Sequence, residues 1–262
     1  MKVISFINLK GGVAKTASVI NTAAILAHDY RKRVLVVDAD SQCNLTEFFK
    51  DGPAAFTLAD LLRDIPEDPS KTRVRAAIDT ANYPFVWLLP GDETLMDLDL
   101  TKVESESVNV ECLLDARMKL DKDYDYCLID CPPAFNAASA AALIASDEVV
   151  IPIKIDAFSL RGMDNITRQL ANMRKINRGL KLAGLLPTMA YKSAKIQEAE
   201  AALRASGLPV FPRIRRSTKV DDMTFSGVPI IETSAHSAAA VDYRRFVVEL
   251  VGKRGGASHG RV

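Results

Sequence analysis

The stretch NLKGGVAKT, residues 8–16, decides the fold of this chain. It follows KVISFI (2–7), a short apolar run rich in β-branched residues that predicts a buried strand. It precedes ASVINTAAILA (17–27), which predicts a helix. In such a strand–loop–helix unit, backbone N–H groups of the glycine-containing loop and of the helix N-terminus point toward a bound anion. The stretch therefore predicts a phosphate-binding loop.

Seven consecutive residues of this loop and helix start are candidate nucleotide ligands. Lys15 supplies a positive charge for the terminal phosphates, and the hydroxyl of Thr16 is placed to ligate Mg²⁺. The usual pattern G-x-x-x-x-G-K-[ST] is not met, because Leu9 and Ala14 occupy its glycine positions. A methyl group at Ala14 is tolerable if φ is negative there and costly if φ is positive. The alternative interpretation is a glycine turn with solvated lysines. The candidate ligands are Gly11, Gly12, Val13, Ala14, Lys15, Thr16 and Ala17.

Carboxylates follow two further predicted strands. The run VLVVD ends at Asp38 and is followed by Asp40, and the run DYDYCLIDCPP (123–133) carries Asp130 at its strand end. Because ligands bind at the carboxyl ends of the strands in a parallel sheet, we expect all three beside the phosphate loop. A carboxylate in the position of Asp130 is typical of a Walker B site, which holds Mg²⁺, here through water. The alternatives are a helix N-cap at the first pair and a simple strand-ending aspartate at the second.

Apolar strands that alternate with helices predict an α/β fold with a doubly wound, mostly parallel sheet and helices on both faces. Residues 1–251 predict a single domain, and 252–262 predict a basic, glycine-rich flexible tail. Residues 47–110 are the least informative. Further strands are expected at 83–90, 147–153 and 181–189, and further helices at 57–62, 93–100, 108–120, 136–145, 156–177, 193–206 and 238–251.

Net charge, apolar runs and cysteine spacing limit the functions that the chain can have. The formal net charge of the 262 residues is +1, so DNA binding would need a local basic patch or its duplication in a dimer. No apolar run approaches the roughly 18 residues of a membrane-spanning helix, and no signal peptide is expected. The cysteines show no metal-ligand spacing and are expected to be free thiols. They are Cys43, Cys112, Cys127 and Cys131.

Three motifs resemble the ParA/MinD family of ATPases. K-G-G-x-x-K-T, starting at Lys10, resembles the family's deviant phosphate loop K-G-G-x-G-K-[ST], in which Ala14 replaces a glycine. DADSQCNLT resembles D-x-D-P-Q-G-N-x-T, with Ser41 and Cys43 in place of proline and glycine. DYDYCLIDCPP resembles Y-D-x-I-I-I-D-x-P-P. The resemblance spans nearly the whole chain, is strong at these three loops and is thin between residues 47 and 120.

The resemblance implies a slow ATPase that uses ATP and Mg²⁺. Lys10 would be the signature lysine, which reaches the nucleotide of the partner subunit, so that ATP binding produces a homodimer. Asp40 would orient or activate the attacking water, and Asp38 would support the metal shell. The family contacts adenine at the end of the last predicted parallel strand, which makes Thr188 and Met189 candidates. Ordinary strand-end residues are the alternative there.

A basic segment, PVFPRIRRSTKVDDM (209–223), resembles the family's I-P-R-x-x-[RK]-x-x-E-A-P motif. Arg216 and Lys219 align best with its DNA-contacting positions, and Arg213 and Arg215 add local charge. Basic side chains near a helix start can neutralise phosphates. The alternative is a solvated basic face that nearby aspartates balance.

The biological role follows from the same resemblance. It implies ATP-dependent, non-specific binding to double-stranded DNA, and partition of a plasmid, chromosome or mobile element. A ParB-like centromere-binding protein would stimulate hydrolysis. The expected location is cytoplasmic and nucleoid-associated.

Three other functions compete with this one. A MinD-like membrane ATPase would need an apolar face in the C-terminal tail, which the sequence lacks, so no stable membrane anchoring is expected. An iron–sulfur relative would need two well-placed cysteines in each subunit. A third possibility is a non-enzymatic switch, in which Ala14 and the altered D-x-D loop reduce hydrolysis to a negligible rate.

Overall fold

The computed structural model describes residues 1–64, 73–98, 108–155 and 163–252. These residues form a seven-stranded sheet with the order β3-β4-β2-β5-β1-β6-β7. Only the two-residue edge strand β3 is antiparallel to its neighbour, and the other pairings are parallel. The predicted doubly wound, mostly parallel sheet is thus confirmed. The strands are β1 (Lys2–Phe6), β2 (Val34–Asp38), β3 (Asp79–Thr80), β4 (Val86–Leu89), β5 (Tyr126–Asp130), β6 (Glu148–Lys154) and β7 (Lys181–Thr188).

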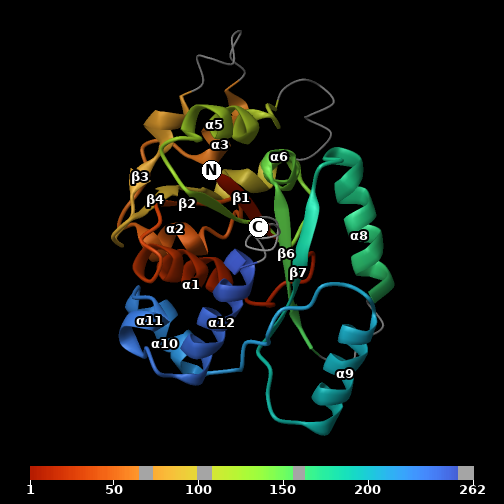
Figure 1. The fold of residues 1–262 in the computed structure, drawn as a ribbon. Helices are drawn as coiled ribbons and strands as arrows, with labels where there is room; N and C mark the ends of the chain where they lie inside the picture. The colour runs from red at the N-terminus through yellow and green to blue at the C-terminus, as the bar shows by residue number, and fades with distance from the viewer. Residues whose placement is uncertain (65–72, 99–107, 156–162, 253–262) are drawn as a thin grey trace, which may run out of the picture.

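Helices cover both faces of the sheet (Figure 1). Apolar side chains from the two faces of the strands fall into two separate clusters, each closed by its own set of helices. A strand buried on both sides must be apolar throughout, which is why β2 and β5 read as continuous apolar runs. The helices are α1 (Lys15–His28), α2 (Asn44–Phe49), α3 (Leu58–Arg63), η2 (Val74–Ala77), η3 (Glu93–Asp97), α5 (Cys112–Leu120), α6 (Ala137–Ala145), α8 (Met163–Ile176), α9 (Ala194–Ala205), α10 (Thr218–Ser226), α11 (Ile230–Thr233) and α12 (Ala238–Gly252).

One core cluster joins the first helix of the chain to the last. Side chains of α1 and α12 pack together against β1, and Phe246 lies edge-on to Phe6 and Phe211, with ring centroids 6.4 and 4.8 Å apart. The other cluster lies under α3, α5, α6 and α8 and includes Leu62, Leu113 and Met173. Together the two clusters fix the sheet from both sides, so the loops at its carboxyl edge start from rigid strands.

Strand register brings the predicted site to one edge of the sheet. Asp38 of β2 lies opposite Asp130 of β5, and Phe6 of β1 lies opposite Asp130 on the other side. The phosphate loop leaves β1 at this same edge. The two carboxylates and the loop therefore meet without any contribution from the least regular part of the chain.

Several predicted boundaries are corrected by the structure. The strand expected at 83–90 is only Val86–Leu89, because Phe85 takes a left-handed turn conformation with φ of 62°. The helix expected at 93–100 is described as a 3₁₀ turn, Glu93–Asp97, and the one expected at 108–120 begins at Cys112. The helix α12 includes Gly252, which was assigned to the tail. The start of the helix expected at 156–177 and the remaining tail, 253–262, lie outside the described residues.

Within the described residues, no helix combines the length and the apolar character that crossing a bilayer requires. The four cysteines are free thiols, as predicted.

Gly91, which follows β4, is required by close packing against the site. A Cβ at this position would lie 2.8 Å from the backbone oxygen of Asp38 and 3.2 Å from Leu95 Cδ1. We expect Gly91→Ala to lower the free energy of unfolding by about 1–3 kcal/mol, because the backbone of β2 must shift. Thermal unfolding measures this. Gly252→Ala is the matched control, since no atom lies within 4 Å of its Cβ position, and it should leave the melting temperature unchanged or slightly raised. Equal effects of the two substitutions would contradict the packing argument.

Candidate nucleotide-binding site

The phosphate loop is tied to the sheet by Asn8. Its side-chain amide donates to the carbonyl oxygen of Pro152 in β6 over 2.8 Å, and its Oδ1 accepts from the backbone nitrogen of Lys10 over 2.9 Å. Thr188 at the end of β7 provides a second tie, because its buried hydroxyl lies 3.1 Å from the carbonyl oxygens of both Val13 and Ile153. The loop is therefore held by β6 and β7 as well as by its own strand.

The backbone of the loop contains a strained residue. Gly12 and Ala14 have φ of 66° and 61°, in the left-handed region that residues with a Cβ avoid. Ala14 is the N-cap of α1, and its carbonyl accepts from the backbone nitrogen of Ser18 and from its hydroxyl. Cys43, the N-cap of α2, has φ of 55°. The two positions at which a family glycine is replaced thus both keep a conformation that suits glycine.

Lys15, Thr16 and Asp130 meet at the start of α1. The Thr16 hydroxyl donates to Asp130 Oδ2 over 2.5 Å, and the side chain of Lys15 is almost completely buried. The other carboxylate oxygen, Asp130 Oδ1, is buried and has no hydrogen-bond partner among the described residues. Burial, followed by the charge of Asp38, raises the pKa of Asp130 well above its ordinary value, against the opposing influence of Thr16 and Lys15.

Asp38 shapes the loop that carries Asp40. It accepts from the backbone nitrogen and the hydroxyl of Thr46, both over 2.8 Å, and from the backbone nitrogen of Asp40 over 3.2 Å. Burial raises the pKa of Asp38 to about 6, and these hydrogen bonds limit the rise. The Thr46 hydroxyl in turn accepts from the Gly91 nitrogen over 3.0 Å. Both oxygens of Asp38 are therefore engaged in holding the loop.

Asp40 borders a cavity of about 740 Å³ that the phosphate loop also lines, from Gly11 to Ala17. Its carboxylate is largely buried and accepts from the Gln42 nitrogen over 3.1 Å. A second cavity of about 490 Å³ is lined by Thr188, Met189 and Arg216. Ala14 and Met189 line both cavities, so the two spaces meet beside the phosphate loop.

The residues fit a divalent cation. The charges of Asp38 and Asp40 both act on Asp130 and are opposed by buried Lys15, although among the described residues these carboxylates do not form a ready-made three-ligand cluster. The orphaned Oδ1 of Asp130 supplies an acceptor without a donor, and the Thr16 hydroxyl lies beside it. Oxygen donors of this kind are what Mg²⁺ prefers. Asp130 and Thr16 would hold the ion. Asp38 would not contact it and instead fixes the loop that carries Asp40 through its hydrogen bonds.

The predicted DNA-contacting cluster is largely neutralised within the chain. Arg213 pairs with Glu200 over 2.7 Å, Arg215 with the buried Asp242 over 2.7 Å, and Lys219 with Asp222 over 3.0 Å. Arg216 is exposed and forms no ion pair with any described residue, and it lines the second cavity. DNA contact at these positions stays a prediction.

Lys10 is exposed at the loop, so its side chain is accessible from outside the subunit. Its role toward a second subunit stays a prediction.

Three of the cysteines, Cys112, Cys127 and Cys131, are buried, and no group of three potential metal ligands occurs among the described histidines, cysteines and carboxylates. Burial of these thiols argues against the iron–sulfur alternative, which needs cysteines that can bridge subunits.

Sequence reasoning missed the residues that support the site. Asn8 accepts from the backbone of Lys10, Thr46 donates to Asp38, and the Gly91 nitrogen donates to Thr46. Thr46 belongs to the quoted D-x-D segment, so its place in that motif was an available signal. Nothing in the pattern around Gly91 indicated that β4 ends against Asp38.

These features define a phosphate-binding loop of the nucleoside-triphosphatase kind. A family model described as an AAA domain matches residues 1–182. The chain is 30% identical over 261 residues to the chromosome partitioning protein ParA of Caulobacter vibrioides, covering 97% of this chain and 95% of that protein. The fold matches an ATP complex of McdA from Cyanothece with a TM-score of 0.80 at 25% identity, covering 96% of each chain. It matches cobyrinic acid a,c-diamide synthase from Mycobacterium smegmatis with bound ADP and magnesium with a TM-score of 0.79 at 27% identity, covering 97% and 96%.

The chain therefore belongs to the ParA/MinD-type P-loop ATPases. The three motifs predict this family, and the comparisons confirm it over almost the whole chain. The similarity includes residues 47–120, where the sequence shows no motif of the family.

Relief of strain at Ala14 is testable by one substitution. Ala14→Gly should raise the free energy of unfolding by about 0.5–1 kcal/mol, because the gain from removing a left-handed alanine exceeds the entropy that glycine adds to the unfolded chain. Chemical denaturation measures this. The matched control is Ala17→Gly, three residues further along in α1, which should destabilise by about 1 kcal/mol. A loss of stability at both positions would show that Ala14 is not strained.

Crowded carboxylates predict a pH-dependent stability. Because the folded-state pKa of Asp130 is raised, its ionised form destabilises the folded protein at neutral pH. Asp130→Asn should raise the melting temperature of the nucleotide-free protein by roughly 2–6 °C at neutral pH. This advantage should shrink as the pH falls through the folded-state pKa, because the wild-type carboxyl then becomes protonated.

The same variant should lose about tenfold or more in Mg²⁺ affinity, measured by titration in the presence of ATP. Asp51→Asn, at an exposed position lining the same cavity, is the control and should change neither quantity appreciably. A melting temperature of Asp130→Asn equal to or below that of the wild type at neutral pH would refute the electrostatic argument.

Proposed function

We propose that this chain is an ATP-dependent, dimerising DNA-partition ATPase. The single observation that carries the proposal is that Lys15, Thr16 and Asp40 line one cavity at the phosphate loop, where Thr16 also donates to Asp130. The ParA relative named above supports the partition role.

The nucleotide spans the two joined cavities. Their volumes, about 740 and 490 Å³, are in the range of small-molecule sites. Loop amides and Lys15 bind the phosphates, and the base extends past Ala14 toward Met189. Thr188 lines the second cavity, and its buried hydroxyl also holds the loop through the carbonyl oxygen of Val13.

Hydrolysis depends on the position of one water molecule. Asp40 borders the phosphate cavity and is fixed by the turn that Asp38 and Thr46 organise, so its carboxylate orients the attacking water. Bound Mg²⁺ supplies charge neutralisation to the phosphates. Lys15, buried beside Asp130, stabilises the negative charge that develops as the terminal phosphate is transferred. The reaction is expected to be slow until a partner stimulates it.

ATP then acts as the bridge between two subunits. Among the described residues, the lining of the phosphate cavity carries three carboxylates, Asp40, Glu47 and Asp51, and one cation, Lys15. Lys10 of a partner subunit would add a positive charge to the bound triphosphate there. Dimerisation doubles the basic surface of a chain whose own net charge is small, so affinity for non-specific double-stranded DNA rises with ATP. A ParB-like protein would stimulate hydrolysis and release the dimer from the nucleoid.

A second function is favoured by one observation. The left-handed Ala14 and Cys43 lie in the two loops that must close on the phosphates. If their strain prevents closure, the protein is a switch that binds ATP and dimerises without turnover. Steady-state phosphate release with and without DNA separates the two, since the switch gives no release above background.

The two lysines of the loop separate binding from dimerisation. Lys15→Ala should abolish ATP binding, because the buried charge that holds the phosphates is lost. Lys10→Ala should retain ATP binding but remain monomeric by light scattering with ATP and Mg²⁺. Both variants should lose ATP-dependent retention on DNA, measured without nucleotide, with ADP and with ATP. Two results for the wild-type protein would contradict the proposal. One is a monomer when the protein is saturated with ATP, and the other is equal DNA binding without nucleotide, with ADP and with ATP.

A further inference from the structure

A cluster of cations lies outside the site described above. The segment RKINRGLK, residues 174–181, carries four basic side chains and no acidic one. It runs from the end of α8 to the start of β7, and we refer to it as the basic stretch. All four cations are exposed, and none forms an ion pair with any residue that the structure describes. They are Arg174, Lys175, Arg178 and Lys181.

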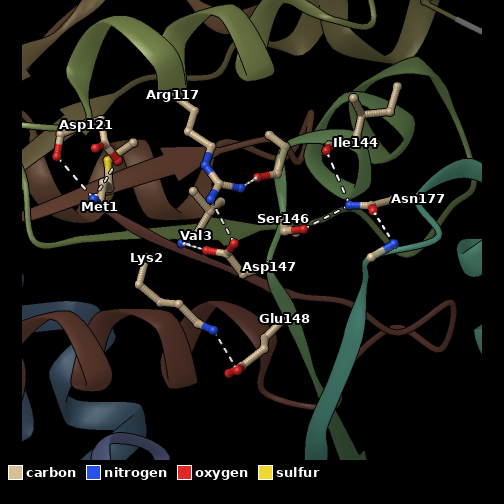
Figure 2. A network of polar contacts seen from close by, with 12 residues as sticks. Met1, Lys2, Val3, Arg117, Asp121, Ile144, Ser146, Asp147, Glu148 and Asn177 are labelled. Carbon is tan, nitrogen blue, oxygen red and sulfur yellow. Dashed lines mark hydrogen bonds and ion pairs between the residues drawn. The ribbon is translucent and has the colours of Figure 1, made fainter. Parts of the chain in front are cut away.

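Nearby acidic residues do not neutralise this charge. Glu148 pairs with Lys2 over 2.6 Å, and Asp147 pairs with Arg117 over 2.8 Å and also accepts from the backbone nitrogen of Val3 (Figure 2). These carboxylates already have cationic partners of their own. The basic stretch therefore keeps its full positive charge in a chain whose formal net charge is only +1.

The basic stretch is held rigidly against the sheet. Asn177 lies in its middle, and its side-chain amide donates to the carbonyl oxygens of Ile144 and Ser146 over 3.3 and 2.9 Å (Figure 2). The same amide donates to the carbonyl oxygen of Leu143 over 2.9 Å. Its Oδ1 accepts from the Gly179 nitrogen over 2.9 Å. A fixed backbone presents the four cations together, so a polyanion that binds them need not order the segment first.

Attraction to a helix C-terminus explains only part of the pattern. Arg174 and Lys175 lie in the last turn of α8, where cations are favoured by the helix dipole. Lys181 is the first residue of β7 and lies beyond the reach of that turn. If the four cations of the basic stretch had only a structural role, we would also expect them to form ion pairs within the chain. None of them forms an ion pair with a described residue.

The chemistry fits a nucleic-acid backbone better than a membrane. Binding to a bilayer surface requires large apolar side chains beside the cations. In the basic stretch the exposed apolar side chain is Ile176, which is 37% exposed. A row of arginine and lysine side chains without apolar anchors is instead what phosphate neutralisation requires, and such contacts carry no base specificity.

We propose that the basic stretch is the principal contact of this protein with the DNA backbone. The inference rests on the proposed function, because it names the surface by which the ATP-bound form holds DNA. It differs from the sequence prediction, in which Arg216 and Lys219 make this contact. Three of the four cations in that predicted cluster are already paired within the chain.

The geometry allows a clean test. The basic stretch adjoins the start of β7, whereas Thr188 ends the strand beside the phosphate loop. At about 3.3 Å per residue, the two ends of this strand are roughly 23 Å apart. Substitutions in the basic stretch should therefore leave ATP binding and basal phosphate release unchanged.

The experiment measures binding to a random-sequence duplex with ATP and Mg²⁺ over a series of salt concentrations. Arg174→Glu combined with Arg178→Glu should weaken binding about tenfold or more near 0.1 M salt. It should also make the slope of log affinity against log salt shallower by about 1.8 for each protomer. The matched control is Lys122→Glu with Arg245→Glu, which makes the same charge change at two exposed positions elsewhere and should have a much smaller effect.

The other outcomes are equally informative. Loss of binding in Arg216→Glu with Lys219→Glu, and not in the basic-stretch variant, overturns the inference in favour of the predicted cluster. Equal weakening by the control pair overturns it as a general charge effect. Retention of the wild type on phosphatidylserine vesicles, lost in the variant while DNA binding persists, assigns the stretch to a membrane. If the double variant unfolds, Arg178→Gln alone should still reduce the slope by about 0.9. A wild type without DNA binding in any nucleotide state contradicts the proposed function itself.

Discussion

Three carboxylates share one strand edge with a single buried lysine, and much of the local structure exists to hold them there. Asp38 and Asp130 lie side by side because the register of the parallel strands β2 and β5 pairs these two positions. Burial raises the pKa of each, which means that their negative charges are poorly compensated in the ligand-free chain. Thr46 donates to Asp38 and accepts from the Gly91 nitrogen, and Thr16 donates to Asp130. The other carboxylate oxygen of Asp130 has no hydrogen-bond partner among the described residues. A cation bound at such a site would stabilise the folded protein, so affinity for the ion and instability of the ligand-free protein would have one physical origin.

The phosphate loop shows the same compromise in its backbone. Ala14 and Cys43 hold conformations that glycine adopts without strain, and each begins a helix that borders the nucleotide cavity. Asn8 and Thr188 tie the loop to β6 and β7, so the surrounding sheet over-determines its shape. Strain of this kind persists only where the neighbouring structure enforces it. Ala14 and Cys43, where the family has glycine, therefore raise the free energy of the two loops through backbone strain, while the backbone keeps a conformation that suits glycine.

Much of the fold followed from local pattern. Continuous apolar runs ending in Asp38 and Asp130 indicated parallel strands buried on both faces, and the strand order brought both carboxylates to the phosphate loop as expected. A local signal failed where a tertiary contact overrode it, because the strand expected at 83–90 begins late where Phe85 turns the chain. The sequence also could not show that Arg213 and Arg215 of the basic segment pair with Glu200 and Asp242, which lie 13 and 27 residues away. Pairing across such distances has no local signature. The basic stretch, by contrast, can be read in the sequence as four cations without an acidic residue, but its lack of ion pairs within the described residues became evident only in the structure.

The short helix α6 has a consequence for communication across the molecule. It begins just after the proline pair that follows Asp130, with Asn136 as its N-cap. Near its C-terminus, the carbonyl oxygens of Leu143 and Ile144 accept from the side chain of Asn177. Figure 2 shows the contact to Ile144. Nine residues of helix form a rod of about 13 Å whose small side chains pack tightly and leave little room to bend. The loop that follows Asp130 and the segment between α8 and β7 are thus joined by one short helix and the hydrogen bonds of a single asparagine.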